Sequence, residues 1–224
     1  SFYKPLREAG LGVDILHPMA SLEGFRLVIA PHLHLLDDAL TAHLLAYVQG
    51  GGHLVLGPRS GFKDPNNALL PSRQPGPLAE PLGAHVEEYY ALEGPVGVYG
   101  AWGTGEASIW AEWLPADAPD VHVLFSHRPS NGWLDGQPAM VTRPVGLGRL
   151  TYLGAWLDAP LMRKVTHWLT TTSRVVPALT DLPDGVELCQ RAGAGTEVFL
   201  LINHNAHPVQ IGRASCRERV FRVV

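Results

Sequence analysis

The strongest candidate for an interaction surface in this sequence is a short loop that combines an arginine, a phenylalanine and a lysine. It directly follows the apolar run Leu54–Leu56 and Gly57. Loops at the carboxyl ends of parallel strands bind ligands in α/β proteins, and arginine and phenylalanine are favoured in interface cores. We therefore predict that the loop contacts a partner or lies near an active site, through Arg59, Ser60, Phe62, Lys63 and Asp64. The alternative, a solvent loop held by its own hydrogen bonds, stays open.

Histidine is abundant, with 11 residues, but its spacing does not indicate a metal centre. His32 and His34 follow the apolar run Leu27–Ala30, and His204 and His207 are separated by two residues. No Asp, Glu or Cys completes a zinc set at a familiar spacing around either pair. We interpret them as surface histidines and predict neither a metal nor a cofactor.

Tryptophans and paired carboxylates are the remaining groups with possible chemistry. Several tryptophans lie in or beside glycine-rich turns, where they could stack on sugar rings, but packing is the expected role of such residues. The adjacent pairs Asp37-Asp38 and Glu87-Glu88 are explained by a helix cap and by a solvated strand face. The tryptophans concerned are Trp102, Trp110, Trp113 and Trp133.

The elements that position the candidate loop form a strand, a helix and a second strand. Leu27–Ala30 and Leu54–Leu56 lack polar residues, as do strands covered on both faces. Between them, Asp37 or Asp38 can cap a helix, and Gly50–Gly52 ends it. Apolar residues recur every four positions along that helix, at Leu36, Leu40, Leu44 and Val48. This order predicts a right-handed parallel crossover and an α/β domain.

The rest of the chain predicts further strands, two helices and a hairpin. We expect helices over 2–9 and from 158 or 159 to 172, with a helical turn at 77–82 inside a long loop. Strands are expected at 13–16, 84–90, 109–114, 121–125, 139–142 and 149–153, and 91–105 is dominated by glycine and proline. The alternating segments 186–191 and 198–203 predict a β-hairpin of an antiparallel domain.

Composition limits the classes of partner. The chain is 46% hydrophobic and 17% charged, which is ordinary for a globular protein. Its net charge of −4 argues against a nucleic-acid partner, and no apolar run approaches a membrane span. Two cysteines, Cys189 and Cys216, provide neither a disulfide framework nor a zinc cluster. We therefore expect a reducing, cytoplasmic location, with no nucleic-acid or membrane partner.

Five segments carry a resemblance to a known family: AGLGVDILHP, LVIAPHLHLL, VQGGGHLVLGPRSGFKDPNN, GPLAEPLGAHVEEYYAL and TRPVGLGRLTYLGAWLD. In order and spacing they resemble the middle domain of the glycoside hydrolase family 42 β-galactosidases, over residues 1 to about 172. The run GGHLVLGPRSGFKDPNN is the most specific part. Residues 182–211, with LPDGVEL and FLLINHN, resemble the start of the small C-terminal β domain of the same family.

The resemblance implies a fold and an assembly. The fold is α/β, with a flavodoxin-like or class I glutamine-amidotransferase-like layered sheet whose first strand is missing here, followed by the beginning of an antiparallel β domain. We expect a trimerisation domain over 1–176, a linker over 177–183 and the start of the β domain over 184–210. The expected partner is the chain itself, in a homotrimer.

The resemblance also implies where catalysis lies. In the family, two glutamates on an N-terminal (β/α)₈ barrel hydrolyse terminal β-D-galactosyl residues, and a retaining glycosidase needs its two carboxyl groups about 5–5.5 Å apart. This sequence contains no barrel, so we predict no catalytic residue, and contact with a β-galactoside only through the missing barrel. An amidotransferase-type enzyme is disfavoured, because Gly57-Pro58-Arg59-Ser60-Gly61 lacks a nucleophilic cysteine. The alternative is a stand-alone, non-catalytic amidotransferase-like binding or assembly module.

The last residues do not follow the pattern of the rest. Residues 211–224 form a basic stretch without apolar periodicity that resembles the translation of a common sequencing adapter. We interpret this segment as a sequencing artefact, with a natural basic terminus as the alternative.

Overall fold

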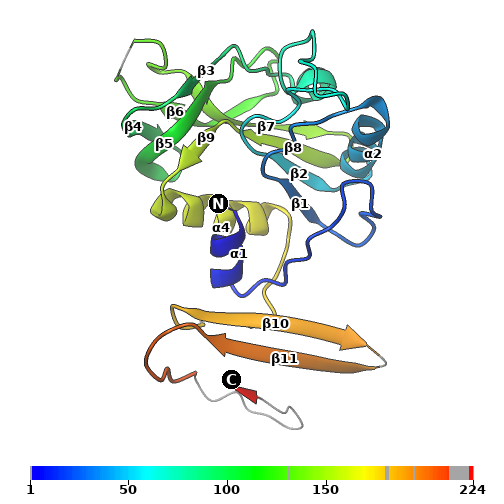
Figure 1. Ribbon diagram of the computed structural model, residues 1–224, viewed down its shortest axis with the longest axis vertical. Coiled ribbons are helices and arrows are strands. Elements are labelled where there is room, and N and C mark those ends of the chain that lie inside the picture. The colour runs from blue at the N-terminus through cyan, green and yellow to red at the C-terminus, as the bar shows by residue number, and fades with distance from the viewer. Residues whose placement is uncertain (1, 131, 180–181, 194, 212–221, 224) are drawn as a thin grey trace. The chain divides into compact units, whose positions relative to one another are not determined.

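The computed structural model describes residues 2–130, 132–179, 182–193, 195–211 and 222–223 (Figure 1). These residues form two compact units. Unit 2 runs from His17 to Arg174, and unit 1 combines the described residues of Ser1–Leu16 with those of Val175–Val224. No helix in these ranges is long and apolar enough to cross a membrane.

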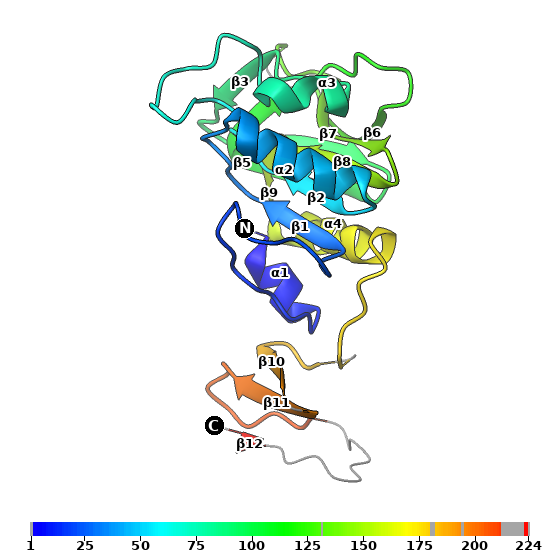
Figure 2. The same ribbon diagram turned by 90° about the vertical axis from the view of Figure 1, so that its right-hand side faces the viewer.

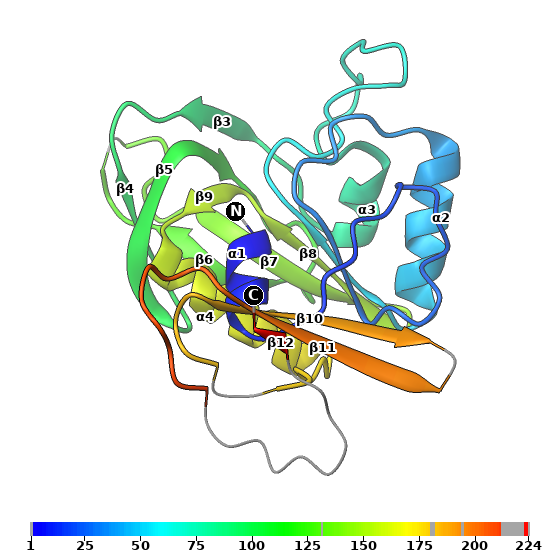
Figure 3. The same ribbon diagram turned by 60° about the horizontal axis from the view of Figure 1, so that its bottom comes forward.

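Unit 2 is built on one mixed sheet. Its strands are β1 (Leu27–Ala30), β2 (His53–Leu56), β8 (Gly148–Leu153), β7 (Pro138–Val145), β6 (His122–His127), β4 (Val96–Gly100), β5 (Gly103–Trp113) and β3 (Glu88–Ala91), in that spatial order, with β9 (Ala155–Leu157) paired to β5. Only β1, β2 and β8 are parallel to one another, and the remaining neighbours are antiparallel. The sheet curls at its antiparallel end (Figure 3). The predicted α/β class is therefore confirmed, with a mixed sheet.

Helices cover both faces of this sheet, as Figure 2 shows: α2 (Asp38–Gln49) and α3 (Ala79–Leu82) lie on one side and α4 (Ala159–Thr172) on the other. The carboxylate of Asp37 caps α2 by accepting from the Leu40 amide at 2.7 Å. The predicted stripe of α2 is buried against β2 and β8, with Val48 completely inaccessible. A short 3₁₀ turn, η1 (Gly76–Leu78), leads into α3. The predicted strand–helix–strand unit is confirmed.

Several predicted strands need correction. Val13–Leu16 is not a strand, and Ile15 is 88% exposed, because no neighbouring strand pairs with it among the described residues. Strand β1 is half-buried rather than covered on both faces. The glycine-rich stretch 91–105 contains strand β4 and the start of β5. Strand β3 begins at Glu88 rather than at residue 84, and β9 follows β8 after a single glycine.

Unit 1 joins the two ends of the described chain. Helix α1 (Tyr3–Glu8) packs on strand β10 (Val186–Gly193), which forms the predicted hairpin with β11 (Thr196–Asn203). The backbone of β12 (Arg222–Val223) pairs with β11. Most of the segment interpreted as an artefact, residues 212–221 and 224, lies outside the described residues, and that interpretation stays a prediction.

Candidate functional site

The candidate loop leaves β2 in a sharp turn that glycine and strained backbone make possible. A side chain at Gly57 would place its Cβ 1.9 Å from the Pro31 carbonyl oxygen, so only glycine fits. Arg59, two residues later, has φ 65°, a left-handed conformation that costs an L-residue about 1–2 kcal/mol. The surrounding structure must therefore hold Arg59 in place, and strain of this kind concentrates at functional sites.

Part of that support comes from the loop that follows β1. The buried hydroxyl of Ser60 donates to the Gly57 carbonyl at 2.8 Å and accepts from the Leu33 amide at 3.3 Å. The ring of His32 donates from Nδ1 to the Pro58 carbonyl at 2.9 Å and stacks on Trp156 at 5.3 Å. The loops after the two parallel strands therefore form one connected structure.

The rest of the support comes from Glu112, a side chain on β5 that is completely inaccessible to solvent. Its Oε1 atom accepts from the Arg59 backbone amide at 2.9 Å and from the Trp110 indole Nε1 at 2.8 Å. Burial raises the pKa of Glu112 to about 7, against the two hydrogen bonds, which favour the ionised form. One buried oxygen atom thus holds both Arg59 and Trp110.

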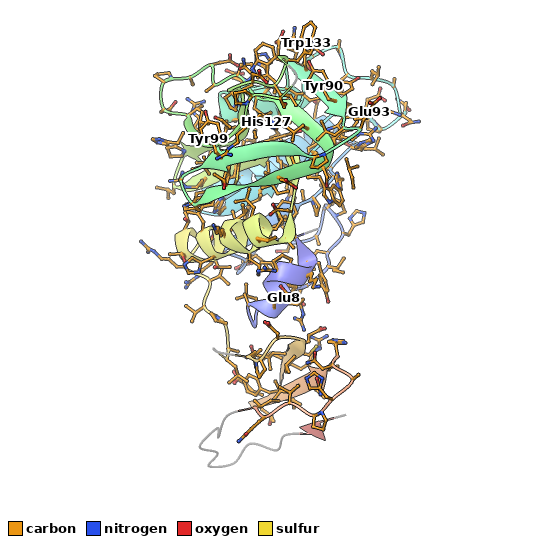
Figure 4. All side chains as sticks on the ribbon, turned by 90° about the vertical axis from the view of Figure 1, so that its left-hand side faces the viewer. Glu8, Tyr90, Glu93, Tyr99, His127 and Trp133 are labelled. Atoms are coloured by element: carbon orange, nitrogen blue, oxygen red, sulfur yellow. The ribbon has the colours of Figure 1, made fainter. Side chains whose placement is uncertain are left out.

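Two further buried groups surround Glu112. Burial and the neighbouring carboxyl raise the pKa of Tyr152, on β8, far above its ordinary value. Neither the Tyr152 hydroxyl nor Glu112 Oε2 has a well-formed hydrogen bond among the described residues. His127, labelled in Figure 4, donates from Nε2 to the backbone oxygen of Glu112 at 3.2 Å. The carboxyl group is therefore enclosed by β5, β8 and the turn after β2, whereas His127 on β6 binds the backbone of the same residue.

Above Glu112 lies a layer of aromatic rings. The Arg59 guanidinium lies 4.9 Å from the ring centroid of Trp110 and 5.9 Å from that of Phe62. Tyr89 stacks on Trp110 at 5.2 Å and meets Phe62 edge-on at 5.4 Å. Phe62 is buried, and the His34 ring stacks on it at 5.8 Å. Arg59, Tyr89 and Trp110 therefore present an accessible cationic and aromatic patch, called here the Arg59 surface.

The five residues predicted from the sequence have different environments. Arg59 and Phe62 are brought together, whereas Ser60 is buried in the turn. Lys63 donates from Nζ to the Asn67 side chain at 2.8 Å. Asp64 Oδ1 accepts from the amides of residues 66 and 68, both at 2.9 Å. Internal hydrogen bonds therefore shape the loop, and Arg59 is the member that joins the accessible aromatic patch.

The sequence interpretation did not identify Glu112, and for Trp110 it favoured packing over stacking on a sugar ring. A signal was present, because Glu112 is the single charged residue within the apolar run Ile109–Leu114. A charge in such a run needs a partner if the strand is buried. Ile109 gives a second indication in the structure, because its φ of 69° is exceptional for a β-branched residue and marks a bulge in β5.

A second surface feature lies on α4. A shallow hollow of about 470 Å³ is lined by Trp102, Arg163, Lys164, His167, Trp168 and Thr171.

Within the ranges that the structure describes, no group of three His, Cys, Asp or Glu side chains is placed to hold a metal ion. His32 and His34 stack on aromatic rings, and burial lowers the pKa of His34.

Comparison with known proteins gives the family. A family model described as the β-galactosidase trimerisation domain matches residues 1–175. The β-galactosidase Bga of Halorubrum lacusprofundi is 37% identical over 206 residues, which cover 86% of this chain and 29% of the relative. A β-galactosidase of an Arthrobacter species is 32% identical, with 91% of this chain and 29% of the relative covered. The chain thus spans less than a third of these relatives' length.

Solved structures agree with this result. The structure of the Halorubrum lacusprofundi β-galactosidase superimposes with a TM-score of 0.76 at 38% identity, covering 84% of this chain and 28% of that protein. That of the Rahnella sp. R3 β-galactosidase gives a TM-score of 0.84 at 27% identity, covering 92% and 31%. By sequence and by fold, the chain belongs to the β-galactosidase trimerisation domain family.

Proposed function

We propose that this chain is the non-catalytic, trimer-building portion of a β-galactosidase that hydrolyses terminal β-D-galactosyl residues. The observation that carries the proposal is the trimerisation-domain match over residues 1–175, together with relatives that are themselves β-galactosidases. Catalysis is assigned to a separate (β/α)₈ barrel of the whole protein, where two carboxyl groups do the chemistry of a retaining glycosidase. The described residues contribute self-association.

The coding DNA on either side of this chain tests that proposal directly. We expect an upstream reading frame that encodes a (β/α)₈ barrel with two glutamates at strand ends. A start codon immediately before Ser1 would favour the second candidate, a stand-alone amidotransferase-like assembly module. The mixed sheet without a nucleophilic cysteine at the turn after β2 is compatible with both.

The finer fold assignment rests on that turn. We place unit 2 among flavodoxin-like, class I glutamine-amidotransferase-like domains whose catalytic site has been replaced. The support is the parallel core of β1, β2 and β8 and the strained residue in a tight turn after a buried strand, where such enzymes carry a nucleophile. In this chain the strained position is Arg59, whose guanidinium has no nucleophilic chemistry.

The Arg59 surface is the subunit contact that we propose for the homotrimer, with the contact lying near the barrel mouth of the neighbouring subunit. Tyr89 is 49% exposed and stacks on Trp110, and the Arg59 guanidinium lies over the same ring. Arginine and aromatic residues are enriched in interface cores, and planar side chains lose little entropy on binding. A preformed patch of this kind would lose little further freedom on association.

Replacement of Arg59 by alanine tests the contact in the full-length protein. Arg59→Ala should weaken the trimer by about fivefold or more in dissociation constant, as expected for an interface residue worth more than about 1 kcal/mol. The readout is the subunit mass measured across a dilution series. Arg128→Ala, an exposed arginine that follows β6, is the matched control and should leave the mass unchanged. An Arg59→Ala protein that stays trimeric at the same dilutions would contradict the proposed contact.

The remaining elements of the proposal concern location and other partners. A cytoplasmic location is supported by a cysteine content too low for a disulfide framework. The net charge of −4 speaks against binding to nucleic acid.

A further inference from the structure

The two halves of the Arg59 surface depend on a single buried group. We propose that Glu112 is the positioning residue of this surface, and that ionisation of its carboxyl group strengthens the contact with a neighbouring subunit. The inference rests on the proposed subunit contact through Arg59. Beyond that contact, the inference assigns a role to Glu112, a residue that does not itself touch the partner, and it implies that assembly depends on pH.

The geometry of the hydrogen bonds carries the first step. Oε1 of Glu112 accepts from the Arg59 backbone amide at 2.9 Å and from the Trp110 indole at 2.8 Å. The same two residues form the closest cation–π pair of the patch, at 4.9 Å. Both partners of that pair are therefore fixed relative to each other through one oxygen atom, which lies below the surface they form.

Backbone strain carries the second step. Arg59 has φ 65° and Ile109, next to Trp110, has φ 69°. Neither conformation is one that these residues prefer, so both positions are strained. The backbone preferences of Arg59 and Ile109 alone would therefore favour a different conformation of both segments. The Glu112 hydrogen bonds connect the strained turn after β2 to the strained bulge in β5, so they oppose that relaxation.

The charge of the carboxyl group decides how firmly the two donors are held. Hydrogen bonds to an ionised acceptor are about twice as strong as neutral ones. The titratable groups around the carboxyl are the Arg59 guanidinium, which favours ionisation, and the Tyr152 hydroxyl on β8. His127 on β6 faces the backbone oxygen of Glu112 instead. Because burial raises the pKa of Glu112 to about 7, the group changes charge near neutral pH.

Assembly and folding should then respond to pH in opposite directions. Above pH 7 the ionised group binds the two donors more strongly, so the trimer should tighten. The folded-state pKa lies above the ordinary value of 4.5, so the folded chain binds more protons than the unfolded chain between these two values. The contribution of Glu112 to folding stability is therefore complete below pH 4.5 and is lost as the pH rises to 7. If Glu112 only supported the fold, trimer affinity and folding stability would change with pH in the same direction.

The test compares the full-length wild-type protein with Glu112→Gln at pH 6 and pH 8. Glutamine keeps the Oε1 acceptor but cannot ionise. We expect the trimer dissociation constant of the wild type to fall by about three- to tenfold from pH 6 to pH 8, and that of the variant to change much less. Chemical denaturation at the same pH values should show the opposite trend for the wild type and a smaller trend for the variant.

A second variant keeps the test decisive if Glu112→Gln does not fold. Trp110→Phe retains an aromatic ring beneath Arg59 but removes the indole donor, so it should weaken assembly most at pH 8. If both variants keep the wild-type pH dependence of assembly, the role of Glu112 is overturned while the contact through Arg59 stands. If Arg59→Ala leaves the trimer unchanged, the proposed contact fails and the inference fails with it.

Discussion

Arg59 combines a strained backbone with an accessible side chain, and the two properties can be separated by substitution. Glycine adopts φ 65° without cost, whereas alanine keeps the left-handed strain and, like glycine, removes the guanidinium. We predict that Arg59→Gly unfolds with a free energy about 1 kcal/mol higher than Arg59→Ala. Denaturant titrations of the two variants measure this difference.

Both variants lose the cation–π pair with Trp110, so both should assemble equally weakly. Equal unfolding free energies would show that the turn after β2 does not store strain at this position. A Gly variant that is more stable than its Ala counterpart yet equally poor in assembly would show that the turn is strained at this position and that assembly depends on the guanidinium.

The sequence indicates Arg59 as a candidate contact residue, and that role stays a prediction, but it does not indicate the residue beneath it. Arg59 follows an apolar strand and a glycine, and a basic residue at that position is visible without a structure. Glu112 lies 53 positions later, and its role depends on β5 curling so that a side chain from one strand meets a turn from another. Periodicity within a segment carries no information about such a contact between distant segments.

Among the elements, local signals predicted those whose residues follow a single pattern. The helix α2 has a cap, a stripe and a glycine stop, and β2 is a short apolar run between turns. Strand β4 was missed because glycines interrupt it, and β9 was missed because it has only three residues and pairs with a part of β5 that is distant in the sequence. Val13–Leu16 has the composition of a strand, but a strand forms only where a neighbour accepts its hydrogen bonds, and none of the described residues does so.

The attachment of α4 to the sheet depends on one aspartate that has two functions. Asp158 Oδ1 caps the helix by accepting from the Leu161 amide at 2.8 Å, and Oδ2 accepts from the Glu106 amide of β5 at 2.8 Å. We predict that Asp158→Ala lowers the free energy of unfolding by about 2 kcal/mol, one helix cap and one further hydrogen bond. Urea denaturation measures the loss.

Asp37→Ala is the matched comparison, because the Asp37 carboxylate caps α2 by accepting from the Leu40 amide and accepts no hydrogen bond from the sheet among the described contacts. It should cost about 1 kcal/mol. Equal losses for the two variants would mean that the contact between Asp158 and β5 adds nothing to stability.

At the scale of the whole molecule, the chain is organised by contacts between segments that are far apart in sequence. Residues 2–16 belong to the same compact unit as the hairpin that begins near residue 186, although the family match runs continuously over residues 1–175. The predicted domain boundaries, at residue 176 and residue 184, follow sequence similarity and stay a prediction. In the structure, helix α1 packs on β10, which lies beyond those boundaries.

Arg7 makes the polar part of this connection. Its buried guanidinium donates to Glu187 Oε1 at 2.7 Å and to the backbone oxygen of Leu188. Hydrogen bonds from His204 and Arg7 hold the pKa of Glu187 below 4.5, so the stabilisation is complete above that pH and is lost as the pH falls below it. We predict that Glu187→Gln gives α1 and the hairpin faster hydrogen exchange at neutral pH, several-fold or more, because a buried charge on Arg7 loses its counter-ion. Exchange in α4 of unit 2 should stay unchanged. Equal acceleration in α1 and α4 would show instead that the two units unfold together, and no acceleration in α1 would show that apolar packing alone holds it to the hairpin.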